Sequence, residues 1–288
     1  MKVPVTKPNW KWPLRVAAMC LLLSTGACGK SEPVYSGISV QGFNYLPYNL
    51  EDFTVTDAYG DKAGGGGDNP PGAGEGSFTC CYKLKGTEFT VKWSYYDADQ
   101  WTMEDSHIQH AEAKVTMPPS PVPDKIGTRI LNVHFYPDHH VEMAFPGKML
   151  GDTRMPIVEV SKWMDRYQAQ LDKRYDDNWA ELHRRISRSF ASAWLKYRLT
   201  DQADFEQFVY FDLLVNDHFD AHPEVQRILR ATRSKPSQFS QAMQALPSQV
   251  LAELKSNQFK HVSVPVIPGG LLPPPRANEN ADAHKGAA

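Results

Sequence analysis

Two groups of residues have types and spacings that could support chemistry: an adjacent cysteine pair and a set of histidines. Cys80 and Cys81 lie side by side in the segment FTCCYKLKG. They could form a strained vicinal disulfide, although neighbouring side chains of a strand point to opposite faces. The alternative is a structural pair, with one thiol packed as a small hydrophobe and the other facing a turn or solvent. A redox centre is disfavoured, because the C-x-x-C motif expected of such an enzyme does not occur.

Four histidines are candidate ligands for zinc or copper: His107, His110, His134 and His139. Against this hypothesis, the sequence has no H-E-x-x-H motif, and His139 lies in a predicted turn, where polar residues are common. A hydrolase is not favoured either, because the sequence lacks the G-x-S-x-G motif that would mark a nucleophilic serine. A metal-binding protein or a hydrolase therefore stays as an alternative. The sequence predicts neither a catalytic residue nor a cofactor.

Two further patterns indicate structural roles. The run from Gly64 to Gly67 lacks the G-x-x-x-x-G-K-[ST] spacing of a phosphate-binding loop, and it predicts a flexible surface loop instead. Arg184, Arg185 and Arg188 recur along one predicted helix. We interpret them as a solvated basic stripe. The alternative is that they contact an acidic patch on a partner protein.

The N-terminus has the pattern of a secretory leader. The first 15 residues carry four basic side chains and no acidic one, and residues 16–27 are apolar or small without a charge. A basic stretch followed by an apolar run of this length is typical of a signal peptide, because a membrane-spanning helix needs about 20 apolar residues. An ordinary cleaved leader would satisfy this pattern too.

The end of the leader is more specific. Ser24-Thr25-Gly26-Ala27-Cys28 resembles the lipobox of bacterial lipoproteins, with Thr25 where leucine is usual. The resemblance implies that Cys28 carries diacylglycerol, that cleavage precedes it and that the new N-terminus is acylated. Gly29 follows, where enteric bacteria use aspartate for inner-membrane retention, so we expect a periplasm-facing outer-membrane anchor. Several acyl chains anchor stably, at about 0.8 kcal/mol per buried methylene.

Charge and cysteine content restrict the partners. The leader holds four of the 31 basic residues and none of the 33 acidic ones, so the mature chain has a formal charge of −6. A nucleic-acid partner is disfavoured, because it would require a basic surface. Cys20 leaves with the leader, which makes Cys80 and Cys81 the remaining free thiols in an oxidising compartment.

The chain divides into a β-rich half and a helical half, so the predicted fold class is α+β. Alternation of apolar residues predicts mostly antiparallel strands in a sandwich-like sheet. The predicted strands cover residues 35–48, 51–57, 88–96, 108–117, 129–136 and 141–145. The predicted organisation is a leader at 1–27, a tether at 28–34, a β-rich domain at 35–150, a helical region at 151–260 and a Pro-rich disordered tail at 261–288.

The helical half should form a bundle of about four helices. Apolar residues at helical spacing predict one long helix over 176–199. Residues 200–203 form an N-cap region for a second helix, and Pro223 begins a third. A fourth, over 236–256, is interrupted at Pro247.

Four segments together resemble a known family. They are Gly42-Phe43-Asn44, the stretch from Gly64 to Cys81, Val91-Lys92-Trp93, and the stretch from His134 to His139. Their order after the lipobox is similar to a family of proteobacterial lipoproteins catalogued only as a domain of unknown function. The resemblance covers about residues 28–145.

Members of that family commonly lie beside genes for type VI secretion lipase effectors. The resemblance therefore implies an immunity protein, which binds a phospholipase effector and inhibits it before it damages the membrane. It implies no enzymatic activity and leaves the binding residues unknown. The alternative from another class is a non-enzymatic envelope lipoprotein that binds a different membrane component.

Overall fold

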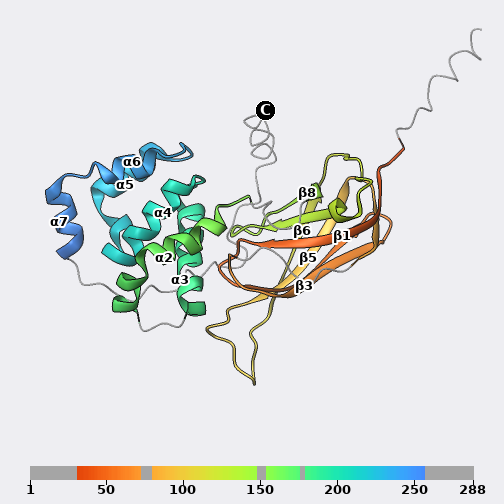
Figure 1. The fold of residues 1–288 in the computed structure, drawn as a ribbon, viewed down its shortest axis with the longest axis horizontal. Helices are drawn as coiled ribbons and strands as arrows, with labels where there is room; N and C mark the ends of the chain where they lie inside the picture. Colours follow the sequence, from red (N-terminus) through yellow and green to blue (C-terminus); the bar gives the residue numbers. More distant parts are fainter. Residues whose placement is uncertain (1–30, 73–79, 148–153, 176–178, 257–288) are drawn as a thin grey trace, which may run out of the picture. The chain divides into compact units, whose positions relative to one another are not determined.

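The computed structural model describes residues 31–72, 80–147, 154–175 and 179–256 (Figure 1). Cys28, the predicted leader and the predicted tail lie outside these ranges. The described residues from Pro33 onward belong to one compact unit that holds both strands and helices.

The described residues form eight strands in two four-stranded sheets. In the first sheet the order is β4 (Tyr82–Lys85), β1 (Val34–Asn44), β7 (Ile130–Phe135) and β8 (Val141–Gly147). In the second it is β3 (Lys62–Asn69), β2 (Asn49–Asp57), β5 (Glu88–Tyr96) and β6 (Gln109–Thr116). Two of these strands, β3 and β4, were not among the six predicted segments. All pairs are antiparallel except β1 with β7. The predicted α+β class and the mostly antiparallel β half are confirmed.

The two sheets enclose a shared apolar core. The inward residues of β5 are those that its alternation predicts, Phe89, Val91, Trp93 and Tyr95, and all four are buried. Trp93 packs against Phe135 of the other sheet, with ring centroids 5.5 Å apart. Burial of side chains this large stabilises the packing of one sheet on the other.

Strand β3 contradicts the prediction of a flexible glycine loop. Gly64, Gly65 and Gly66 pair with β2 in an antiparallel ladder. A Cβ at Gly65 would lie 2.8 Å from the ring of Phe53, its partner in the ladder, so a residue without a side chain leaves room for this ring against β3. The low strand propensity of glycine concealed this role in the sequence.

Replacing Gly66 by alanine should destabilise the protein by about 2 kcal/mol. Gly66 has φ +150°, and its Cβ would lie 2.7 Å from both Asp52 Cα and Glu51 O, backbone atoms that cannot rotate away. Urea unfolding measures the change. The matched control is Gly127→Ala, where a Cβ meets nothing within 4 Å, and it should change stability by less than about 0.5 kcal/mol. Equal effects from both substitutions would contradict the close approach.

The helical half contains more helices than the predicted four. The described residues form six α-helices: α2 (Ile157–Arg174), α3 (Trp179–Ser192), α4 (Gln202–Tyr210), α5 (Pro223–Thr232), α6 (Gln238–Gln244) and α7 (Ser248–Ser256). Helix α3 continues as a π-helix over Ala193–Tyr197, which confirms most of the predicted long helix. Asp201 caps α4 by accepting a hydrogen bond from Ala203 N, as predicted. No described helix is both long enough and apolar enough to cross a bilayer.

The helices pack around a second apolar core. Three aromatic residues of the β-rich half, Phe43, Tyr45 and Tyr136, belong to this core rather than to the one between the sheets. Tyr136 stacks on Trp194 with ring centroids 5.7 Å apart. The edge of the sandwich and the helices therefore share buried surface.

Candidate functional site

The structure joins Cys80 and Cys81 by a disulfide directly before β4. Both residues are exposed, so neither packs as a buried hydrophobe. The disulfide therefore lies at the protein surface and not in the apolar core. Cys28, the predicted lipidation site, lies outside the described residues.

The candidate metal ligands occupy different environments. His107 and His110 are exposed, whereas His134 is fully buried and His139 is half-buried against the rings of Trp93 and Tyr95. Among the described residues, no three or more His, Cys, Asp or Glu side chains come together in a way that could hold a metal ion. The geometry of these ranges gives the metal-binding alternative no support.

His134 has a packing role. Its ring stacks on Phe43 and Tyr45, with centroids 4.8 and 5.8 Å away, and its Nδ1 lies 2.9 Å from the Tyr45 hydroxyl. That hydroxyl also accepts a hydrogen bond from Arg154 N at 2.7 Å. We therefore assign the Tyr45 hydroxyl as the donor to Nδ1 of His134, which accepts. Burial, helped by the charge of Arg154, lowers the pKa of His134 to about 3, which keeps the imidazole neutral.

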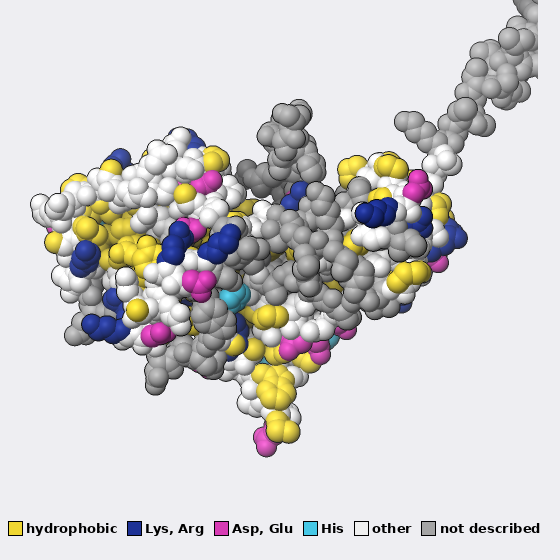
Figure 2. Space-filling model, in the orientation of Figure 1, with side chains coloured by type: hydrophobic (Ala, Val, Ile, Leu, Met, Phe, Trp, Pro, Cys, Tyr) yellow, Lys and Arg dark blue, Asp and Glu magenta, His cyan; other side chains and the backbone are white. Residues whose placement is uncertain are grey.

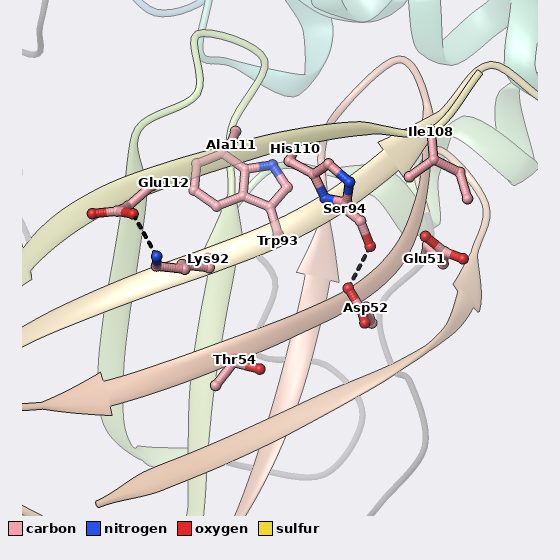
Figure 3. Close-up of a pocket in the computed structure, with 10 residues that line it drawn as sticks. All are labelled: Glu51, Asp52, Thr54, Lys92, Trp93, Ser94, Ile108, His110, Ala111 and Glu112. Atoms are coloured by element: carbon pink, nitrogen blue, oxygen red, sulfur yellow. Dashed lines mark hydrogen bonds and ion pairs between the residues drawn. The ribbon is translucent and has the colours of Figure 1, made fainter. Parts of the chain in front are cut away.

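A groove of about 600 Å³ lies over the outer face of β2, β5 and β6 (Figure 3). Ser94 Oγ donates a short hydrogen bond to Asp52. His110 lies opposite Ser94 in the register of β5 and β6. These are the residue types of a hydrolytic triad in a different order, because in a triad the histidine lies between the serine and the carboxylate. Here the hydroxyl of Ser94 donates its hydrogen bond to the carboxylate and not to a histidine, so the geometry does not activate Ser94.

The most exposed apolar surface lies beside this groove, in the connection from β5 to β6. We call residues Asp97–Ile108 the projecting loop, because Figure 1 shows it extending away from the sheets. Exposed fractions are 50% for Trp101, 92% for Met103 and 37% for Ile108. Figure 2 shows hydrophobic and acidic atoms together at its end. Large apolar side chains gathered at an exposed tip are typical of a binding element.

The tip of the projecting loop has its own internal hydrogen bonds. Thr102 N donates to Asp105 O at 3.1 Å, and Asp105 N donates to Thr102 Oγ1 at 3.0 Å, which closes a turn with Met103 at its apex. The carboxylate of Asp105 accepts a hydrogen bond from His107 N at 2.9 Å. These contacts restrict the tip to a defined shape.

The base of the projecting loop is attached to helix α3 by two arginines. Arg188 lies 2.7 Å from Asp97 Oδ1 and 2.5 Å from Asp99 Oδ2, and Arg184 Nε donates to Asp99 Oδ1 at 2.7 Å. The side chains of Arg188 and Asp97 are 7% and 8% exposed, so their charges are mutually neutralised inside the protein. Burial acts to raise the pKa of Asp99, but the two arginines outweigh it and hold this pKa below its usual value.

We call the contacts of Arg184 and Arg188 with Asp97 and Asp99 the clamp. The clamp shows that the prediction of a solvated basic stripe is wrong. Arg185 and Arg188 are buried, and the side chain of Arg184 is only 14% exposed. Arg185 lies over the ring of Tyr175, 4.5 Å from its centroid. The acidic groups that meet Arg184 and Arg188 belong to the chain itself, in a segment about 85 residues earlier.

Comparison with protein families finds a match within the β-rich half of the chain. A family model described as "Protein of unknown function (DUF3304)" matches residues 43–143. The matched segment contains most of the sandwich, the groove and the projecting loop, and it ends before helix α2. Over this segment the chain is similar to a family of unknown function. No curated protein and no solved structure shows a significant match.

The projecting loop was not predicted from the sequence. Its signal was present: Trp101 and Met103 interrupt a polar stretch between two predicted strands, where a short turn would contain neither. The clamp had no comparable signal, because Asp97 and Arg188 meet only through the tertiary fold.

Proposed function

We propose that this protein is a non-enzymatic, periplasm-facing outer-membrane lipoprotein that binds and inhibits a phospholipase effector of type VI secretion. The observation that carries the binding role is the projecting loop. It exposes Trp101 and Met103 while buried ion pairs hold its base. The identity of the target rests on the family resemblance and on the lipase genes beside such family members.

Inhibition by binding suits this geometry better than catalysis does. Large side chains on a restrained segment lose little conformational entropy on association, so more of their burial energy appears as affinity. The buried His134 is neutral and packed, and the hydroxyl of Ser94 donates a hydrogen bond to Asp52. Neither residue is arranged to act on a substrate.

The lipid anchor at Cys28 would add to inhibition. A phospholipase acts at the membrane surface, and an inhibitor tethered there meets it at a higher effective concentration than a free one does. Binding itself needs a specific interface, commonly about 1,600 Å² in total. The projecting loop and the neighbouring face of β2, β5 and β6 together offer a continuous surface for it.

A survival assay tests the proposal. A type VI lipase effector encoded beside a gene of the resembled family is directed to the periplasm of a sensitive host, with and without the full-length chain, and colony counts are compared. We expect the wild type to restore growth, and Cys28→Ala to restore it at least tenfold less well at equal expression. A lipase lacking its nucleophile provides the control for toxicity.

The possible results are distinct. Equal rescue by the wild type and Cys28→Ala would keep immunity and remove the requirement for the anchor. Failure of the wild type to rescue, with both proteins expressed, would reject immunity and favour the envelope-binding alternative.

A further inference from the structure

We infer that the projecting loop is the inhibitory element itself, and that its tip inserts into an apolar pocket with a basic rim on the lipase. This inference rests on the proposed function. A lipase needs an apolar pocket for the acyl chain of its substrate, so the pocket entered by the tip would be the substrate entrance. Binding there would block substrate access directly.

The first support is the placement of apolar side chains. Met103 is 92% exposed at the apex of the turn, and Trp101 is half exposed on the segment that leads into it. Aromatic side chains dominate the binding energy of protein interfaces, especially when they enter pockets from which water is excluded. Together, an indole and an unbranched thioether can fill an irregular apolar pocket.

The second support is restraint at both ends of the loop. At the base, Asp97 accepts hydrogen bonds from Asp99 N at 3.1 Å and from Arg188 at 2.7 Å. At the tip, Thr102 and Asp105 close the turn. A segment restrained in this way is ordered before it meets a partner, which lowers the entropic cost of association.

The third support is charge, which distinguishes a protein pocket from a lipid surface. Glu104 and Asp105 are exposed directly beside Met103. An anionic membrane attracts basic residues and repels acidic ones, so this tip is poorly suited to lipid insertion. Carboxylates around an apolar apex instead complement a pocket with lysine or arginine at its rim.

The groove on β2, β5 and β6 extends the same surface. Ile108, at the end of the projecting loop, lines the groove together with His110 (Figure 3). A lipase that received the tip in its pocket would therefore rest its rim on this face. The loop would provide the anchor, and the groove would provide surrounding contacts that exclude water from it.

The experiment compares three full-length chains solubilised in mild detergent: wild type, the Trp101→Ala/Met103→Ala double variant, and Tyr59→Ala. Tyr59 is 58% exposed in the β2–β3 turn, so its substitution removes an exposed aromatic ring elsewhere on the sandwich. Each chain is titrated into the same purified lipase effector that the survival assay uses. Activity is measured on a soluble short-chain ester and, separately, on phosphatidylglycerol vesicles. Equal melting temperatures confirm that the exposed substitutions leave the fold intact.

We expect the double variant to weaken inhibition at least about 30-fold on both substrates, and Tyr59→Ala to change it less than threefold. Inhibition by the double variant equal to that of the wild type would overturn the inference and leave the proposed function standing. Loss confined to vesicles would assign the loop to the lipid surface and overturn it too. A wild-type chain that neither binds nor inhibits the lipase would overturn both the inference and the proposed function.

Discussion

Replacing Arg188 by alanine should lower the free energy of unfolding by about 3–5 kcal/mol. The substitution leaves the carboxylate of Asp97, whose side chain is 8% exposed, without its buried counter-charge. It also removes one of the two arginines that hold Asp99. Urea unfolding with an unchanged m-value measures the loss.

The matched control for this prediction is Arg166→Ala. Arg166 pairs with Glu206 at 2.5 Å, but its side chain is 55% exposed, so water and salt already screen this pair. Its loss should cost less than about 1 kcal/mol. If the two substitutions had similar effects, the clamp on the projecting loop would be no stronger than an ordinary surface ion pair.

The clamp also links stability to binding. Without Arg188 the base of the projecting loop loses two of its contacts with α3 and keeps the one between Arg184 and Asp99. The loop is then less ordered before binding, at a cost in affinity. We therefore expect Arg188→Ala to weaken lipase inhibition even below its melting temperature, where the remainder of the protein is folded.

Acid should destabilise the protein through His134. Burial lowers the folded-state pKa of His134 to about 3, whereas the pKa of the imidazole in the unfolded chain is about 6.5. The unfolded chain therefore binds the proton more strongly, and His134 favours the folded state fully above pH ~6.5. As the pH falls from there towards 3, this contribution is lost at up to about 1.4 kcal/mol per pH unit, about 4–5 kcal/mol in all.

The difference between two pH profiles isolates this effect from other titrating groups. Unfolding free energies of the wild type and His134→Phe are measured from pH 7 to pH 3.5. The variant loses the hydrogen bond to Tyr45 and is expected to be less stable at pH 7, but its profile should fall less steeply below pH 6. Parallel profiles would show that His134 is not the buried neutral group described here.

Local patterns predicted the elements that depend on local sequence. The alternation in β5, the N-cap at Asp201, the start at Pro223 and the interruption at Pro247 all coincide with boundaries or faces in the structure. Each signal is contained in a few neighbouring residues. The sandwich-like β half followed from the number and alternation of such strands.

The remainder depended on contacts between distant segments. The glycine strand β3 pairs with β2 and lies against the ring of Phe53, a contact between segments that local propensity does not predict. Helix α2 was not predicted, since it begins after Pro156 without a side-chain cap. Arg188 resembled a surface residue by its spacing alone, and its burial follows only from the approach of Asp97 across the fold.

Stoichiometric inhibition is the central claim, and one titration tests it most directly. The full-length chain in detergent is added to a fixed micromolar concentration of the lipase effector used in the survival assay, and initial rates on a soluble ester are recorded. The account predicts that activity falls linearly to near zero at about one equivalent, with recovery when the complex is dissociated. Full activity at a tenfold excess of folded chain would contradict it.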